Sequence, residues 1–245
     1  MKFYNKIVLI TGAAVGIGRG AAILFAMEGA KLVLADLNLE KLQALKGELA
    51  QYTSDILIYE CDISNEGRVN EVVRDAVDKY GRIDILVNNA AVWRYWAPFV
   101  ETSTDEWRKL FNINVYGTVY VTKAVLPGMI ENGWGRVINI ASVAGVYGNA
   151  NMVPYSATKG AVIAMTQGLA KEVADKGITV NAISPGTVSS SVDENIDSFQ
   201  QNELNYIGRT GTDRENAALI LYLAGEEAAY ISGQNILIDG CRKKI

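Results

Sequence analysis

The stretch Ile7-Val8-Leu9-Ile10-Thr11-Gly12-Ala13-Ala14-Val15-Gly16-Ile17-Gly18 decides the fold. Its first half is an uninterrupted apolar run, typical of a strand buried on both faces, and its second half is a glycine-rich turn that leads into a helical pattern. Glycines allow the backbone of such a turn to approach a pyrophosphate, and the following helix presents N–H groups and positive potential. A packed strand-to-helix corner without a ligand is the alternative. The residues assigned to this dinucleotide-binding turn are Gly12, Val15, Gly16, Ile17 and Gly18.

Short apolar, β-branched runs recur along the chain between segments of helical period. The predicted strands are Lys6–Thr11, Lys31–Asp36, Asp55–Glu60, Ile83–Asn88, Arg136–Ala141, Thr179–Ile183 and Asn235–Ile238. Strands that alternate with helices predict a doubly wound parallel sheet, which binds ligands beyond the carboxyl ends of its strands. We predict a single Rossmann-type α/β domain with a seven-stranded parallel sheet over residues 1–245, since no linker composition interrupts the chain.

The composition excludes several classes of function. The net charge is −4 with Lys and Arg scattered, so we expect neither nucleic acid nor a membrane as partner. The chain has no histidine, which excludes Ser-His-Asp hydrolysis and His-ligated zinc, and Cys61 and Cys241 have no metal-ligand spacing. We therefore predict no metal site. Without a signal-peptide pattern or an apolar run of the ~20 residues that span a bilayer, we expect a cytoplasmic protein.

Asp36 ends the second predicted strand, about twenty residues beyond the glycine turn, where a carboxylate can accept hydrogen bonds from both ribose hydroxyls of an adenosine. It would also repel a 2′-phosphate. The flanking Val15 and Leu37 are not basic, and Arg19 is interpreted as a solvated residue on a helix face. We therefore expect NAD as the cofactor in preference to NADP.

Tyr155 and Lys159 are four residues apart in a helical segment, so they share one helix face, and Ser142 follows the fifth predicted strand. Taken separately, Tyr155 would be an ordinary core or interface aromatic and Lys159 an ordinary surface charge. Together they suit proton transfer, because Lys159 and the positive nicotinamide ring would both favour the phenolate and lower the pKa of Tyr155 toward the working range. Ser142 would hold the substrate oxygen by a hydrogen bond.

These motifs resemble those of the short-chain dehydrogenase/reductase family over nearly the whole chain. The resemblance implies an oxidoreductase in which Asn114, rather than its neighbour Asn112, fixes a water that links Lys159 to solvent. The sequence departs from the family pattern at Ala91 in place of glycine and at Ser190 in place of threonine. Further cofactor contacts implied by the resemblance, besides Tyr155 and Lys159, are Asp62, Ile63, Asn89, Ala90, Pro185, Gly186 and Val188.

The resemblance also places a substrate lid at about residues 187–206, a polar segment that contains Asp193, Glu194 and Asp197; a solvated loop is the alternative. The aromatic run Trp93–Trp96 either stacks on a substrate, with Arg94 available for a carboxylate, or packs against the body or another subunit. The candidate substrate contacts are Trp93, Arg94, Trp96, Tyr147 and Asn149.

We expect interconversion of a secondary alcohol and a ketone, with a polyol, sugar acid, cyclic alcohol or hydroxysteroid as substrate. One alternative is 3-ketoacyl reduction on an acidic carrier protein, although residues 124–135 hold Glu131 and no Lys or Arg. A non-catalytic dinucleotide sensor and a methyltransferase are others. The resemblance further implies a homotetramer or homodimer, formed through helices at about Thr104–Ile130 and Val153–Lys176 and the C-terminal strand, although the ending Asp239-Gly240-Cys241 departs from the common Asp-Gly-Gly.

Overall fold

The computed structural model describes residues 1–189 and 195–243. Its strands form one parallel seven-stranded sheet in the order β3-β2-β1-β4-β5-β6-β7, which confirms the predicted fold class. Ser190, Asp193 and Glu194 of the predicted lid lie outside the described residues. The strands are β1 (Ile7–Thr11), β2 (Lys31–Asp36), β3 (Ile56–Glu60), β4 (Ile85–Asn88), β5 (Gly135–Ile140), β6 (Ile178–Pro185) and β7 (Asn235–Ile238).

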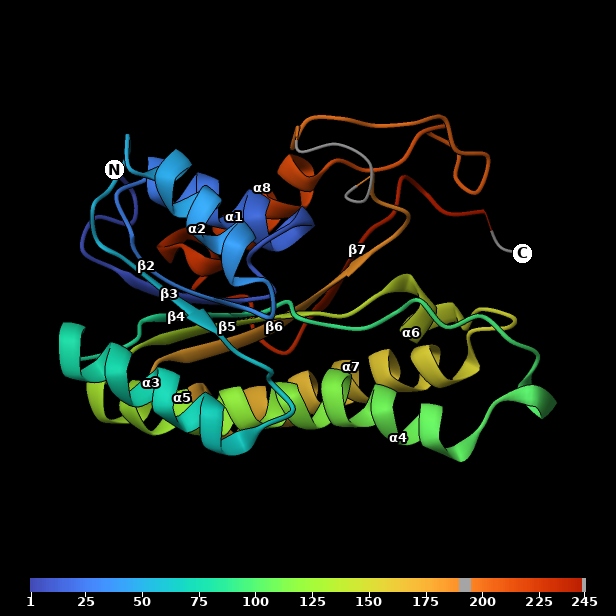
Figure 1. Ribbon diagram of the computed structural model, residues 1–245, viewed down its shortest axis with the longest axis horizontal. Helices are drawn as coiled ribbons and strands as arrows, with labels where there is room; N and C mark the ends of the chain where they lie inside the picture. The colour runs from blue at the N-terminus through green and yellow to red at the C-terminus, as the bar shows by residue number, and fades with distance from the viewer. Residues whose placement is uncertain (190–194, 244–245) are drawn as a thin grey trace.

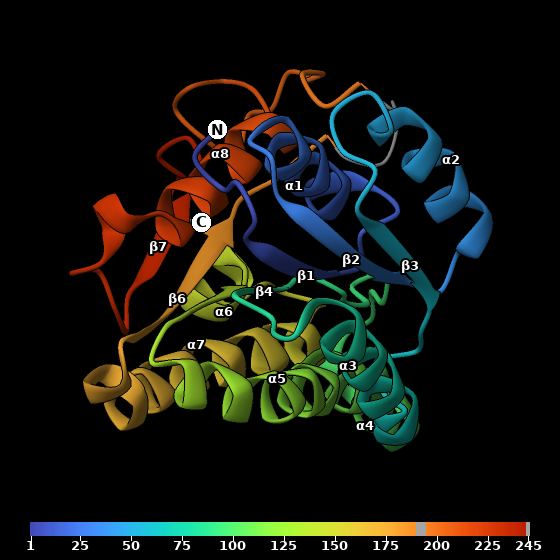
Figure 2. The same ribbon diagram turned by 90° about the vertical axis from the view of Figure 1, so that its left-hand side faces the viewer.

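Helices cover both faces of the sheet (Figures 1 and 2). Helices α1, α2 and α8 lie on one face, and α3, α4, α5 and α7 lie on the other. The helices are α1 (Gly16–Met27), α2 (Leu39–Leu49), α3 (Glu66–Tyr80), α4 (Thr104–Phe111), α5 (Thr118–Asn132), α6 (Val143–Tyr147), α7 (Val153–Val173) and α8 (Asp213–Ala224), with short turns η1 (Phe99–Glu101), η2 (Asn112–Gly117), η3 (Ala174–Lys176) and η4 (Glu226–Ala228).

The apolar strand runs serve two cores at once. In β1, Val8 and Ile10 belong to the core under α1 and α8, whereas Ile7 and Leu9 belong to the core under α3 and α5. Successive side chains of a strand point to opposite faces, so a strand covered on both faces needs apolar residues at every position. Burial of all five β1 residues therefore explains why its sequence does not alternate.

The long helix predicted over Thr104–Ile130 is not continuous. It consists of α4, one widened π-helical turn η2, and α5. Such single-turn bulges insert a residue into the helical ladder and often occur at functional sites. The single long helix was implied by the family resemblance, which does not show where the helical hydrogen bonds widen.

Polar side chains fix several helix starts. Asn38, Asn65 and Ser103 accept hydrogen bonds from the first turns of α2, α3 and α4. Thr212 and Glu215 form a reciprocal capping box at α8. Within the described residues, no helix is long and apolar enough to cross a membrane.

Candidate active site

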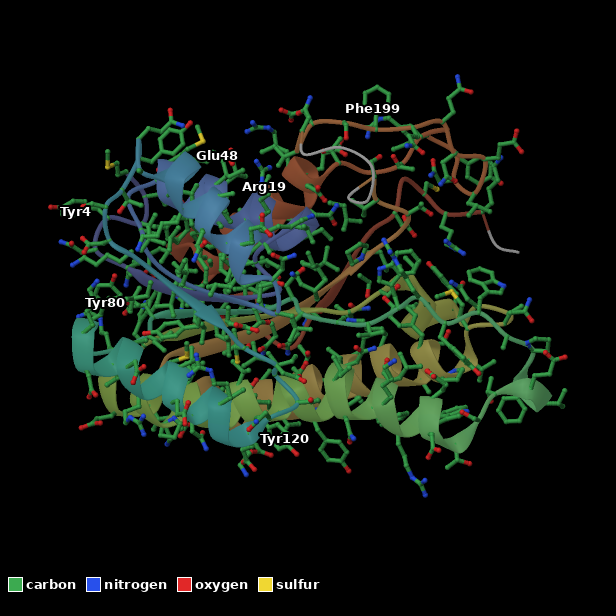
Figure 3. The ribbon with its side chains drawn as sticks, in the orientation of Figure 1. Tyr4, Arg19, Glu48, Tyr80, Tyr120 and Phe199 are labelled. Atoms are coloured by element: carbon green, nitrogen blue, oxygen red, sulfur yellow. The ribbon has the colours of Figure 1, made fainter. Side chains whose placement is uncertain are left out.

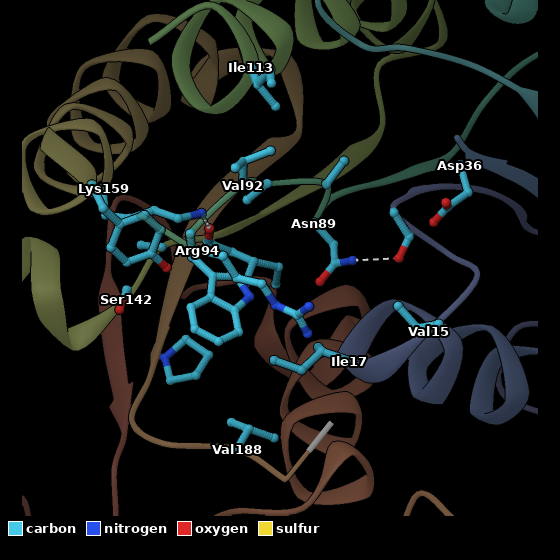
Figure 4. A pocket seen from close by; sticks show the side chains of 18 of the residues that line it. Val15, Ile17, Asp36, Asn89, Val92, Arg94, Ile113, Ser142, Lys159 and Val188 are labelled. Carbon is cyan, nitrogen blue, oxygen red and sulfur yellow. Dashed lines mark hydrogen bonds between the residues drawn. The ribbon is translucent and has the colours of Figure 1, made fainter. Parts of the chain in front are cut away.

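A cavity of about 820 Å³ opens at the carboxyl ends of the strands, as the sheet topology predicts (Figure 4). Its lining joins segments far apart in sequence, from the glycine turn after β1 to the loop after β6. The predicted site residues that line it are Gly12, Val15, Ile17, Asp36, Asp62, Ile63, Asn89, Ala90, Trp93, Arg94, Ser142, Tyr155, Lys159, Pro185, Gly186 and Val188.

Six predicted site residues do not line the cavity, namely Gly16, Gly18, Trp96, Asn114, Tyr147 and Asn149. Trp96 and Tyr147 are 67% and 52% exposed. The backbone N–H of Asn149 donates to Ser156 Oγ, and its side-chain oxygen accepts from Arg242. Asn149 thus ties the loop after α6 to the C-terminal segment.

The glycine turn is built for close backbone packing. Gly12 and Gly16 have φ of +63° and +61°, which L side chains rarely adopt, and a Cβ on Gly18 would collide with the Gly12 carbonyl oxygen. Asn89 Nδ2 donates to that carbonyl over 2.8 Å, which ties the end of β4 to the turn. Helix α1 has no acidic residue in its first turn and no side-chain cap from Val15, so its terminal N–H groups suit an anionic ligand.

Asp36 is held in place by backbone donors at the far end of the cavity. Its Oδ2 accepts from the Ala14 N–H and its Oδ1 from the Asn38 N–H, both over 3.0 Å. Lys41, which the sequence reasoning missed, also lines this end of the cavity. Its backbone N–H donates to the Asn38 cap, and that capping pattern is the signal that could have placed it beside Asp36.

Arg19 is not the solvated helix-face residue expected from the sequence. Its Nη2 donates to Glu48 Oε2 over 2.6 Å, and its side chain is only 15% exposed (Figure 3). The pair joins α1 to α2, and a carboxylate 29 residues away in sequence could not be anticipated from the local pattern.

Ser142 and Lys159 lie at the opposite end of the cavity from Asp36 (Figure 4). Tyr155 lines the cavity beside Lys159. Ser142 caps the short helix α6 through a hydrogen bond from the Ala144 N–H, and its hydroxyl also bonds to the Tyr155 phenol. Lys159 is 3% exposed; its Nζ donates to the Ile140 carbonyl over 2.6 Å and lies 5.8 Å from the Tyr155 ring centroid.

Burial controls the titration of both catalytic candidates. Desolvation of the phenol raises the pKa of Tyr155, and the hydrogen bond from Ser142 opposes this more weakly. Burial also lowers the pKa of Lys159 to about 8. Burial is thus the largest influence on the Tyr155 phenol in the polypeptide alone, which does not favour the phenolate.

Asn114 is buried behind the cavity in the π-helical turn η2, while Asn112 is exposed. Its Oδ1 accepts from the Val92 N–H over 2.8 Å, and its Nδ2 donates to the Val92 carbonyl and to Thr158 Oγ1. Its backbone carbonyl accepts from Thr118 Oγ1 over 2.9 Å. Asn114 thereby connects the loop after β4 to α7, beside Lys159.

Gly145 is a positioning residue that the sequence reasoning missed. A Cβ on it would lie 2.6 Å from the Lys159 carbonyl carbon and 2.7 Å from the Gly160 nitrogen. The absence of a side chain thus allows α6, which begins after Ser142, to pack directly on the turn of α7 that carries Lys159. A glycine three residues after Ser142 was the signal available, but its purpose depends on tertiary packing.

The described part of the predicted lid is tied down by polar contacts. Ser189 and Thr210, which both line the cavity, share a hydrogen bond between their hydroxyls, and Thr210 Oγ1 accepts from the Gln200 N–H. Arg209 forms two hydrogen bonds to the Glu215 carboxylate. The backbone of residues 204–207 also pairs with residues 240–243, so the C-terminal segment supports the lid.

Known proteins resemble the chain over nearly its whole length. Residues 12–241 match the family model described as enoyl-(acyl carrier protein) reductase. The 3-oxoacyl-(acyl-carrier-protein) reductase of Thermotoga maritima is 40% identical over 243 residues, 98% of each chain. The 2-dehydro-3-deoxy-L-rhamnonate dehydrogenase (NAD(+)) of a Sphingomonas species is 32% identical over 98% of this chain and 96% of its own. The crystal structure of NAD+-bound xylitol dehydrogenase matches with a TM-score of 0.89 and 32% identity, over 97% of this chain and 99% of that one.

Proposed function

The chain belongs to the short-chain dehydrogenase/reductase family of oxidoreductases, and from this premise we propose that it interconverts a secondary alcohol and a ketone with NAD as cofactor. One observation carries the proposal. A single cavity has Ser142, Tyr155 and Lys159 at one end and an anchored carboxylate, Asp36, at the other. Such a cavity suits an extended dinucleotide whose reactive end lies beside a proton-transfer group.

The residues present fit a nicotinamide dinucleotide. The uncapped start of α1 suits the pyrophosphate, and Asp36 suits the hydroxyls of the adenosine ribose. We assign further contacts on this cofactor to Asp62, Ile63, Asn89, Ala90, Pro185, Gly186 and Val188, all of which line the cavity. When bound, NAD supplies the acceptor or donor of a hydride.

The anchoring of Asp36 supports NAD over NADP. Because two backbone N–H groups hold both carboxylate oxygens, the side chain cannot rotate away from a 2′-phosphate without losing both hydrogen bonds. Val15 and Leu37 add no positive charge, and Arg19 is paired with Glu48. Among the described residues that line this end of the cavity, only Lys41 carries a positive charge that could attract a 2′-phosphate.

In the proposed mechanism, Tyr155 Oη accepts the alcohol proton during oxidation and returns it to the ketone oxygen during reduction. The Ser142 hydroxyl holds that same oxygen by a hydrogen bond as charge develops on it. Lys159 is oriented by the Ile140 carbonyl, and two further N–H donors of its ammonium remain for the ribose and for water. We assign the other contact of that water to the Asn114 backbone carbonyl, which also accepts a hydrogen bond from the Thr118 hydroxyl.

For the substrate we propose a secondary alcohol of moderate size, such as a polyol, sugar acid, cyclic alcohol or hydroxysteroid. The sugar-acid dehydrogenase and the xylitol dehydrogenase support this choice. A second candidate, 3-oxoacyl reduction on an acyl carrier protein, is favoured by the Thermotoga maritima relative. Residues 124–135 offer an acidic carrier protein no Lys or Arg, which argues against that candidate.

We also propose a cytoplasmic homotetramer or homodimer that binds a small molecule, neither nucleic acid nor a membrane. Both cysteines are free thiols, in keeping with a reducing compartment. Strand β7 is an edge of the sheet, and an edge strand offers unpaired backbone groups to a second subunit. Light scattering coupled to gel filtration would test the assembly.

The Tyr155→Phe variant tests the proposed chemistry. We expect it to bind NADH normally but to lose turnover of its best alcohol by about a hundredfold to ten-thousandfold, since only the proton-transfer group is removed. Tyr230→Phe, a change at a fully exposed tyrosine, is the matched control. NADH absorbance across an alcohol panel measures turnover, and near-normal activity of Tyr155→Phe would contradict the mechanism.

A further inference from the structure

Arg94 extends into the cavity from the loop after β4. Its guanidinium carbon lies 5.3 Å from the Trp93 ring centroid, and Figure 4 shows the group pointing into the space between the Ser142–Lys159 cluster and Ile17. We propose that Arg94 binds a carboxylate of the substrate, so that this enzyme acts on hydroxy acids and their oxo acids in preference to neutral alcohols. This inference rests on the proposed function and names its substrate class.

The charges around the cavity are unevenly distributed. Five charged side chains line it among the described residues, namely Asp36, Lys41, Asp62, Arg94 and Lys159. Both carboxylates belong to the end assigned to adenosine. The catalytic half carries the basic side chains of Arg94 and Lys159 and, in the part of the chain that the structure describes, no carboxylate. An anionic substrate would meet positive potential where the chemistry takes place.

Arg94 has no ion-pair partner within residues 1–189 and 195–243, unlike Arg19 on α1, which Glu48 holds. A guanidinium on an aromatic face keeps the donors along its edge available, and two of those donors match the two oxygens of a carboxylate. Trp93 therefore supports the group, and its donors remain available to a ligand in the cavity that Arg94 lines. Arg94 is exposed to solvent, so its guanidinium is accessible to an incoming ligand.

The cofactor pyrophosphate is the other anion that could approach Arg94. The structure provides for it separately, through the uncapped N-terminus of α1 and the close backbone approach at Gly12 and Gly16. A substrate carboxylate has no comparable partner among the described residues near Ser142. We therefore assign Arg94 to the substrate, and the pyrophosphate becomes an outcome that the experiment can detect.

The test is a binding titration on the enzyme–NADH complex, which requires no turnover. The probes are two acid–neutral pairs of matched size, lactate with lactamide and gluconate with sorbitol, followed by calorimetry or NADH fluorescence. We expect at least one acid to bind about tenfold or more tightly than its neutral counterpart, since a hydrogen-bonded charge pair is lost in the neutral compound. Arg94→Gln should abolish this preference, and Arg94→Lys should retain part of it. Arg74→Gln, a change at an exposed side chain of helix α3, should leave the preference unchanged.

Three results would overturn the assignment. The wild-type complex could bind acids and neutral compounds equally, or the preference for acids could survive in Arg94→Gln. The third result is a loss of NADH affinity in Arg94→Gln with an unchanged acid preference, which would assign the residue to the pyrophosphate. The proposed function would fail in a different way: Tyr155→Phe would keep its turnover, or the wild-type enzyme would not bind NADH. The two failures can be distinguished, because the preference for acids is measured by binding and not by turnover.

Discussion

Substitution of Gly145 by alanine should damage the catalytic site from outside the cavity. The added methyl carbon would lie 2.6 Å from the Lys159 carbonyl carbon, whereas ordinary contacts begin at about 3.4 Å. Both nearest atoms belong to the backbone of α7, which cannot move aside as a flexible side chain does. Helices α6 and α7 must therefore separate by about 0.8 Å at the point where Gly145 packs on the backbone of Lys159.

Two opposing terms set the size of the effect on stability. Overpacking of this kind costs about 1–3 kcal/mol, and replacing a helical glycine by alanine returns up to about 1 kcal/mol. We expect Gly145→Ala to lower the free energy of unfolding by about 1–2 kcal/mol, which is a decrease of about 2–8 °C in Tm for a domain of this size. A displacement of nearly 1 Å among catalytic groups should also lower kcat by up to about a hundredfold.

Gly160→Ala is the matched control, since it adds the same methyl group to the other side of the same helix contact. A Cβ there would meet only the Gly145 carbonyl oxygen at 3.5 Å, which is an ordinary contact. This variant should be as stable as the wild type or up to about 1 kcal/mol more stable, with unchanged kcat. Thermal melts, NADH titrations and turnover would be measured for both variants. Wild-type Tm and kcat in Gly145→Ala would refute the reasoning.

Three further predictions concern charge. Asp36→Ala should weaken NADH binding by about tenfold to a hundredfold, through the loss of charge-assisted hydrogen bonds, and should strengthen NADPH binding, as fluorescence titrations of both cofactors would show. The Arg209 hydrogen bonds lower the pKa of Glu215 to about 2, so the Glu215 contribution to stability is present above about pH 4.5 and is lost as the pH falls toward 2. Because both side chains are about one-third or more exposed, Arg209→Gln should remove no more than about 1 kcal/mol of that acid-sensitive stability in urea melts. Finally, NAD+ affinity should rise with pH while NADH affinity does not, since the positive nicotinamide ring favours the Tyr155 phenolate; Tyr155→Phe should remove this dependence.

The sheet could be predicted from the sequence because each of its strands is coded locally. A parallel strand covered on both faces must be apolar at consecutive positions, and runs such as Ile7–Ile10 satisfy that requirement without reference to the rest of the chain. The ends of the strands were predicted less accurately than the strands themselves. Strand β6 continues through Ser184 and Pro185, because its last residues pair with β7, whose position the β6 sequence does not encode.

Features that depend on two distant segments could not be predicted. The Arg19–Glu48 ion pair and the Asn149–Arg242 hydrogen bond join residues 29 and 93 positions apart. The π-helical turn at Asn114 is also invisible in the hydrophobic pattern, since it is stabilised by contacts of that side chain with Val92 and Thr158. The cavity residues predicted correctly follow strand ends, where topology alone determines which loops meet.

The pKa shifts of Tyr155 and Lys159 indicate that the cofactor must supply the positive charge that makes Tyr155 a base. Burial favours the neutral form of both groups, so desolvation alone gives a protonated phenol and a weakened cation, which is the opposite of what alcohol oxidation needs. The chain opposes this in two places, through the Ser142 hydrogen bond to Tyr155 and the Ile140 carbonyl that receives the Lys159 ammonium. These contacts orient the pair without making Tyr155 a base. Under the proposed function, the missing positive charge arrives with the oxidised nicotinamide, so Tyr155 becomes basic only when an acceptor for the alcohol's electrons is in place.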